Sequence, residues 1–344
     1  MRASLYGSAM RRFLLFLLAL AVLWTGGWFY LTGVLRDRFD ASLANVRSLG
    51  WVISAGRPAR AGFPLEVAIA VPDVTAAGGT ALPVGVSLHA RRVIVAVAVA
   101  HPETLAIDLP VGLDVRPAHG APVAVRATRL VGTAPLTGPH GIEFDATGLT
   151  VAQAGGAAAS AARARLRLEP RGPDLGFDLD VGDVRLPPGS WALGPRIASL
   201  VAVGLAGGAL AVPPANGVRG TAGWLQDWRD HGGKLTLDRL ALDWGPLNVA
   251  GSGTAALDAA LQPDGEAKVT VEGYDQAIAA MAKSGIIAPG PALAGEFALG
   301  LLAKPGKDGA PPSIDVTASL HDGRLSLGGV ELGRVPKLSW PGTP

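Results

Sequence analysis

The chain lacks cysteine altogether, and this absence excludes disulfide bonds and metal sites with thiolate ligands. Aromatic residues make up only 6% of its 344 residues, and its 30 lysine and arginine residues are scattered among 28 acidic ones. A groove that binds nucleic acid needs basic residues gathered on one surface, and the sequence contains no Lys/Arg block. We therefore expect no nucleic-acid partner.

Motifs for catalysis and for cofactors are also missing. The six histidines form neither an HExxH motif nor a pair at positions i and i+4. Asp178, Asp180 and Asp183 lack the spacing of a calcium loop, and the first two fall on the solvent side of a predicted strand. Gly251-Ser-Gly253-Thr lacks the third glycine of a dinucleotide loop, and no G-x-S-x-G motif occurs. The sequence thus predicts no catalytic, cofactor-binding or metal-binding residues, and a protein that is not an enzyme.

One long apolar run lies near the N-terminus. Residues 13–35 form 23 uncharged positions, and about 20 helical residues cross the roughly 30 Å hydrocarbon core of a membrane. Arg11 and Arg12 precede the run and Arg36 follows it, while Trp and Tyr gather in its C-terminal half, as is common at a membrane interface. The alternative is a signal peptide cleaved after residues 19–21, which have the small-x-small form. Cleavage there would leave an apolar N-terminus, so we favour a retained transmembrane helix.

The charges around this run do not decide its orientation. Three arginines precede it, and three follow it up to residue 47. Long domains translocate largely regardless of such counts. We predict a cytoplasmic tail over 1–12 and export of the remaining chain.

The hydrophobic period changes after the apolar run. Residues 36–54 keep helical spacing, which predicts an amphipathic helical stalk within 36–60. From Pro64 onward, apolar residues alternate with polar or small ones, the pattern of antiparallel strands with one buried and one solvated face. Residues 154–164, rich in Ala and Gly, predict a loop or a weak strand edge. This pattern predicts a β-rich domain at 61–190, a mainly helical connector at 191–232 and a second β-rich domain at 233–344.

Two helices are expected among the strands. Residues 222–231 carry Trp224 and Trp228 on one face, and residues 274–287 carry Ile278 and Met281. We expect both helices to cover a sheet face. For the two tryptophans, a place in the core is favoured over a ligand platform.

One spacing of apolar residues, at offsets 0, 2, 5 and 7, recurs along the chain. Looser copies begin at Phe144 and at Leu179. The step of three changes the phase of the strand pleat, which predicts a β-bulge or a tight turn that returns the same face to the core. The two clearest copies supply the candidate residues of a hydrophobic groove or core: Leu235, Leu237, Leu240, Leu242, Leu325, Leu327, Val330 and Leu332.

Several turn motifs resemble a known family. These are WRDHGGKLTL at 228–237, LDWGPL at 242–247, DGRLSLG at 322–328, and Gly62-Phe63-Pro64. Together they resemble an uncharacterised family of proteobacterial envelope proteins, domain of unknown function 2125. The DGxLxL motif is more distantly similar to those of AsmA-like envelope proteins. This similarity implies elongated sheets with a hydrophobic groove and a role in moving or organising lipids.

These observations predict a mainly β protein with a few helices. We expect an N-terminal transmembrane helix followed by antiparallel, repeat-like sheets that are curved or form an open groove. The resemblance implies a single pass through the bacterial inner membrane, with most of the chain in the periplasm. The leading hypothesis is a non-enzymatic protein that binds or handles lipid in envelope maintenance. The alternative is a structural scaffold or assembly partner for another envelope protein.

Overall fold

The computed structural model describes residues 3–48, 51–78, 86–117, 121–137, 141–189, 191–208, 221–285, 289–301, 303–304, 312–335 and 337–338. Within these residues the helices are α1 (Ala3–Ser48), α2 (Thr221–Asp230), α3 (Tyr274–Lys283) and α4 (Pro289–Gly300). The strands are β1 (Trp51–Ser54), β2 (Ala59–Ala61), β3 (Glu66–Gly78), β4 (Ser87–Ala98), β5 (Thr104–Asp108), β6 (Leu113–Arg116), β7 (Val123–Arg126), β8 (Arg129–Pro135), β9 (Ile142–Gln153), β10 (Ala158–Arg171), β11 (Asp174–Arg185), β12 (Arg196–Gly207), β13 (Lys234–Trp244), β14 (Leu247–Leu257), β15 (Pro263–Glu272), β16 (Ser313–His321), β17 (Arg324–Leu327) and β18 (Val330–Arg334).

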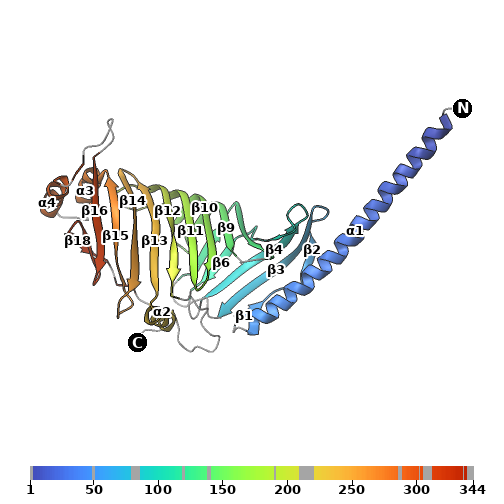
Figure 1. Ribbon diagram of the computed structural model, residues 1–344, viewed down its shortest axis with the longest axis horizontal. Helices are drawn as coiled ribbons and strands as arrows, with labels where there is room; N and C mark the ends of the chain where they lie inside the picture. Colours follow the sequence, from blue (N-terminus) through green and yellow to red (C-terminus); the bar gives the residue numbers. More distant parts are fainter. Residues whose placement is uncertain are drawn as a thin grey trace.

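The N-terminal helix α1 is long and apolar enough to cross a membrane. Figure 1 shows its N-terminal half projecting away from the rest of the molecule, while its C-terminal half lies against the first strands. Helix α1 continues into the predicted helical stalk as far as Ser48, and the prediction of a helix is wrong from Trp51 onward. Trp51–Ser54 and Ala59–Ala61 are strands, because both segments pair with β3.

The strands of the described residues form one 18-stranded sheet, and all of its pairs are antiparallel. Strand β3 pairs with β1 and β2 on one side and with β4 on the other. Two short branches, β5 with β8 and β6 with β7, lie between β4 and β9. From β9 to β18 each strand pairs with the next strand in the chain, and Figure 1 shows most of them side by side in one broad layer. The predicted mainly β, antiparallel fold is confirmed, whereas a curved or groove-like form stays a prediction.

The predicted connector differs from the structure. Residues 191–232 contain strand β12 as well as helix α2, and β12 pairs with β11 and β13, so the sheet continues through this region. The prediction of a mainly helical connector is therefore wrong for Arg196–Gly207. The Ala/Gly-rich segment at 154–164 is also more regular than expected, because β10 begins at Ala158. Helices α2 and α3 lie where helical spacing predicts them, while α4 was not predicted.

The two larger clusters of buried side chains lie at the two ends of the sheet. Near the N-terminus, Ile69, Val71 and Val95 pack under Leu35 and Phe39 of α1. At the other end, α3 and α4 cover β15 and β16 through a cluster formed by Val269, Val271, Tyr274, Ile278, Leu299 and Ile314. Helices thus cover part of the sheet at both ends.

Candidate functional site

One side of the sheet is apolar along nearly its whole width. Successive side chains of a strand point to opposite sides, so cross-strand partners share a side. In β10, Leu166 lies on this apolar face, whereas Arg165 and Arg167 lie on the opposite, polar face. The strand register connects one unbroken row of apolar residues from β3 to β16. In order across the sheet they are Ile69, Val95, Ile107, Gly132, Phe144, Leu166, Leu179, Ala202, Leu240, Gly251, Val269 and Val316.

Among the described residues, no second layer covers the middle of this apolar face. Strands β9–β13 are fully described, and none of their Leu, Ile, Val or Phe side chains is fully buried. Phe144 in β9 is 41% exposed, and Ile107 in β5 is also 41% exposed. By contrast, Val71 and Ile314, at the covered ends, have no exposed surface. The apolar face is therefore core at its ends and open between them.

The four candidate leucines of β13 all lie on the apolar face. A register shift between Leu237 and Leu240 marks a β-bulge, so Leu237 and Leu240 face Gly253 and Gly251 on β14, which are only two residues apart. The predicted bulge is confirmed. It keeps Leu235, Leu237, Leu240 and Leu242 on one side of the sheet although their spacing breaks the strand period.

The second copy of the spacing forms a tight turn, as predicted. Leu327 of β17 pairs with Val330 of β18, and the two residues between them, Gly328 and Gly329, both have positive φ angles, 58° and 84°. A two-residue hairpin turn with two positive φ angles favours glycine at both positions. The side chains of Val330 and Leu332 lie outside the described residues.

In the looser copies, a single residue in the left-handed conformation lies within the step of three. Gly148 in β9 has φ of 59° and Asp183 in β11 has φ of 52°, and each lies inside the step of three. Aspartate tolerates this conformation better than most residues. Asp73 in β3, with φ of 48°, has the same role between Val71 and Val74, a copy that the sequence analysis missed.

A trough of small residues separates the two sets of candidate leucines. Across β13 to β17, one row runs Leu237, Gly253, Ala267, Ala318, Leu327, and the next runs Leu235, Ala255, Gly265, Leu320, Leu325. The floor consists mainly of Gly and Ala, and leucines form the two walls. A hollow of about 180 Å³ lies here, with Leu237 and Leu325 among its lining residues. The structure thus brings four of the eight predicted residues to one feature, whose members Ala267, Ala318 and Leu327 also pack against the core under α3 and α4. Leu240 and Leu242 are half-buried in the neighbouring rows.

The predicted tryptophans belong to α2. Trp228 is half-buried, and its indole N–H donates a hydrogen bond to the Gly207 carbonyl at the end of β12 over 2.9 Å. Leu225 of the same helix packs with Leu257 and Leu261 next to β14. The side chain of Trp224 lies outside the described residues. Trp228 therefore ties α2 to the end of the sheet.

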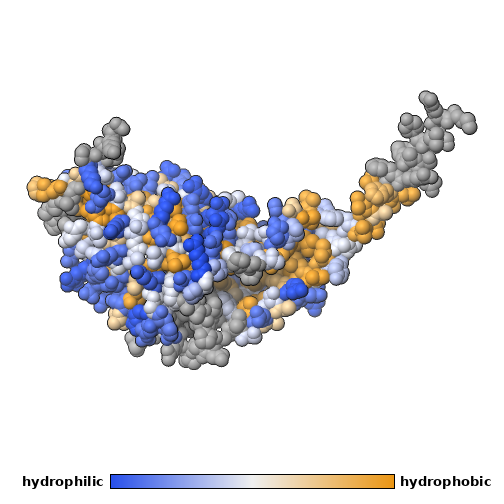
Figure 2. Space-filling view, in the orientation of Figure 1, coloured by the Kyte–Doolittle hydropathy of each residue, from blue (hydrophilic) through white to orange (hydrophobic). Residues whose placement is uncertain are grey.

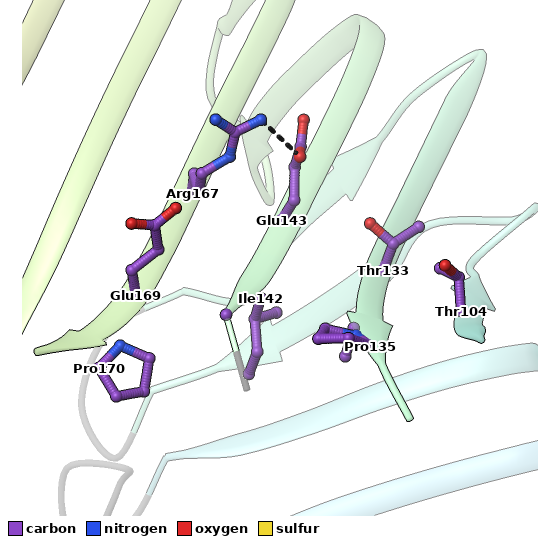
Figure 3. A pocket seen from close by; sticks show the side chains of 10 residues that line it. Thr104, Thr133, Pro135, Ile142, Glu143, Arg167, Glu169 and Pro170 are labelled. Carbon is purple, nitrogen blue, oxygen red and sulfur yellow. Dashed lines mark hydrogen bonds and ion pairs between the residues drawn. The ribbon is translucent and has the colours of Figure 1, made fainter. Parts of the chain in front are cut away.

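The polar face carries charged side chains paired across neighbouring strands. Arg167 of β10 bonds Glu143 of β9 over 2.9 Å beside a hollow of about 430 Å³, shown in Figure 3, and this hydrogen bond raises the pKa of Arg167. Arg165 bonds Asp145 over 2.8 Å in the same way. Within the described residues, no three His, Asp or Glu side chains are grouped as metal ligands would be. Such cross-strand pairs hold neighbouring strands in register.

A second apolar hollow lies where α1 meets the sheet. It has a volume of about 170 Å³, and its walls come from the helix and from Val67 and Val99 at the β3–β4 end of the sheet. The helix residues that line it are Leu20, Leu23, Trp24, Gly27, Trp28 and Leu31. Because Val67 precedes Ile69 by two residues on β3, the strand side of this hollow belongs to the apolar face.

The comparisons identify a family but no described function. No curated protein and no solved structure matches the chain. The more distant similarity to AsmA-like proteins stays a prediction. Residues 28–336 match the family described as uncharacterised protein conserved in bacteria, DUF2125. This match covers the helix contact, the whole sheet and the trough, so the chain belongs to the DUF2125 family.

Proposed function

We propose that this protein binds the acyl chains of lipids on the apolar face of its sheet. In this proposal α1 anchors it in a bacterial inner membrane, the sheet lies in the periplasm, and the protein handles lipid in envelope maintenance without catalysing a reaction. The observation that carries the proposal is the unbroken apolar row from β3 to β16, whose middle section is open.

The energy of apolar surface supports a bound ligand. Exposed apolar patches larger than a few hundred Å² are rare on soluble proteins unless they bind something. Full burial of a large aliphatic side chain is worth roughly 1.5–3 kcal/mol, and each CH₂ of an acyl chain that is buried contributes about 0.8 kcal/mol. An acyl chain lying along Phe144, Leu166 and Leu179 would cover surface that the protein itself leaves half-exposed.

The trough fits the same class of ligand. Its floor of Gly253, Ala267 and Ala318 presents no side-chain hydrogen-bonding group, so it would select a hydrocarbon chain and leave a polar headgroup outside. The hollow beside α1 lies at the other end of the same face. The apolar face therefore starts at the membrane helix and ends at the trough.

Photocrosslinking in the intact protein tests this proposal. The full chain would be reconstituted in nanodiscs with a phospholipid that carries a photoreactive group on its acyl chain, and the adducts would be mapped by mass spectrometry. We expect adducts on β9–β13 and on the trough, far from α1 in Figure 1. Adducts confined to α1 and to the adjoining ends of β3 and β4 would reject the proposal, because lipid around the anchor alone would produce them.

A second function, a scaffold for another envelope protein, is favoured by helix α4. Leu293 and Phe297 of α4 and Leu301 after it are 69%, 72% and 74% exposed, and their spacing of four places them on one face. Figure 2 shows apolar surface at this end of the molecule. Such a face resembles the anchors of a helix that docks in a partner's groove. A site-specific crosslinker at Phe297 that captures one discrete protein in cells, with no lipid adducts on β9–β13, would favour this function.

A further inference from the structure

The turn between β2 and β3 is fixed to the membrane helix. The indole N–H of Trp28 donates a hydrogen bond to the Glu66 carbonyl over 2.7 Å, and Trp28 is only 7% exposed. Its ring also packs edge-on against Phe63, with 5.3 Å between ring centroids. The turn at 62–65 therefore lies at the depth of Trp28, wherever the membrane places that residue.

The length of α1 places Trp28 within the hydrocarbon. The uncharged helix between Arg12 and Trp28 is residues 13–27, or 15 residues (27 − 12). At 1.5 Å per residue this segment spans only about 22 Å, whereas the hydrocarbon core is about 30 Å thick. The missing 8 Å or so corresponds to about five more residues along α1. The hydrocarbon must then extend past Trp28, over the stretch of helix that the sheet contacts.

Large apolar side chains are exposed at this end of the sheet, beside the exposed Glu66. Phe63, Leu65 and Val99 are 53%, 74% and 44% exposed, and Figure 2 shows apolar surface where the sheet meets α1. Backbone groups inside a membrane need partners within the protein. Here the Glu66 N–H bonds the Gly62 carbonyl, and the Val99 N–H bonds the Leu65 carbonyl.

We propose that Phe63, Leu65 and Val99 form a wedge that enters the hydrocarbon of the leaflet facing the sheet, beside α1. The wedge is a second membrane contact, and its partner is the acyl region of the bilayer. His101 and Glu103, which are 74% and 63% exposed at the side chain, pair with each other over 3.8 Å and mark where the surface next to the wedge becomes polar.

The wedge has a geometric consequence for the apolar face. The hollow lined by Leu23, Trp24, Val67 and Val99 would open among acyl chains rather than into water. The wedge does not depend on what the strands farther away bind. A protein that carries no lipid on β9–β13 could still insert it.

Single-cysteine labelling tests the wedge, because the chain has no cysteine of its own. The full chain would carry an environment-sensitive fluorophore at Leu65→Cys or Val99→Cys, in phosphatidylethanolamine–phosphatidylglycerol vesicles with brominated acyl chains. The matched control is Val52→Cys in β1, which is 70% exposed and lies beyond the other end of α1.

We expect blue-shifted emission and several-fold stronger quenching at both wedge positions than at Val52→Cys. Bromine near the headgroup end of the chain should quench more than bromine at the methyl end, because the wedge is shallow. Two wedge labels as water-exposed as the control would overturn the proposal. The two positions lie on different strand ends, so misfolding of one variant would still leave the other to decide.

Discussion

The open middle of the apolar face makes a specific prediction for Phe144 in β9. Covering its exposed 41% with an acyl chain would bury about 80 Å² of a ring that offers roughly 200 Å². At about 25 cal/mol per Å², this contact is worth about 2 kcal/mol, or roughly 25-fold in lipid occupancy at this position. Phe144→Asp removes the contact and places a charge against the lipid, so crosslinked acyl chain on β9–β11 should fall at least 25-fold.

The folded state should tolerate this charge. Both Phe144→Ala and Phe144→Asp lose the packing around the buried part of the ring. The effect of the charge alone is therefore the difference in unfolding free energy between these two variants. At Phe144 we expect this difference in unfolding free energy to stay within about 1 kcal/mol, because the carboxylate can reach water. At Ile314, which is fully buried, the same difference should be about 3 kcal/mol or more.

Guanidinium unfolding of the four variants measures these differences. Thr147→Asp, an exposed position on the opposite side of β9, serves as control and should change neither stability nor lipid crosslinking by much. If the free energy of unfolding drops as much from the Ala to the Asp variant at Phe144 as it does at Ile314, the apolar face is a covered core, contrary to this prediction. Unchanged crosslinking in a folded Phe144→Asp protein would separately refute the lipid contact.

Three further outcomes follow from other parts of the molecule. Gly273→Ala should lower the thermal unfolding midpoint by several degrees. Gly273 has φ of 69°, and a Cβ there would collide with the Pro246 carbonyl in the turn between β13 and β14. The N–H groups of His321 donate hydrogen bonds to the Asp264 and Glu266 carboxylates, which raise the pKa of His321 above 6.5. The stabilisation from the protonated ring is therefore fully present below pH 6.5 and is lost as the pH rises through the raised pKa. The unfolding midpoint should therefore fall slightly between pH 6 and pH 8.5, and His321→Gln should remove that part of the change. A reporter fused to the C-terminus should be active only in a periplasm-dependent format, and activity of a cytoplasmic reporter would reject the proposed orientation.

The sequence predicted best where one face of an element differs from the other. Strands such as β10 and β11 alternate apolar and charged residues, and α3 places Ile278 and Met281 on one side, so their periods are visible locally. Strand β12 was missed because Leu200, Val201 and their neighbours are apolar on both faces, which leaves no period. Helix α4, rich in Gly and Pro, carries apolar side chains on both its exposed and its covered side, so no polar face reveals its period. β1 and β2 are strands only because β3 pairs with them.

The candidate site divides in the same way. The spacing of Leu235, Leu237, Leu325 and Leu327 predicted that they share a face, since this follows from the pleat of each strand. The trough between them was not predictable, because its floor depends on which residues of β14, β15 and β16 stand opposite one another. The wedge was hidden for a similar reason. Its depth depends on the contact between Trp28 and Glu66, which are far apart in the chain.

The recurring spacing also explains how one apolar face can run along such long strands. Strands of 11 to 14 residues, such as β9, β10 and β13, exceed the usual five or six, and long strands in a wide sheet must twist and bend. A bulge in β13 and left-handed residues at Asp73, Gly148 and Asp183 each shift the pleat by one residue. Had the sequence kept a strict period of two, every such shift would have turned the following apolar residues to the polar face. The step of three compensates for the shift, so the chain keeps its apolar residues on one side. A sheet that had to hide this face as an ordinary core would need a second layer over β9–β13, and the described residues provide none.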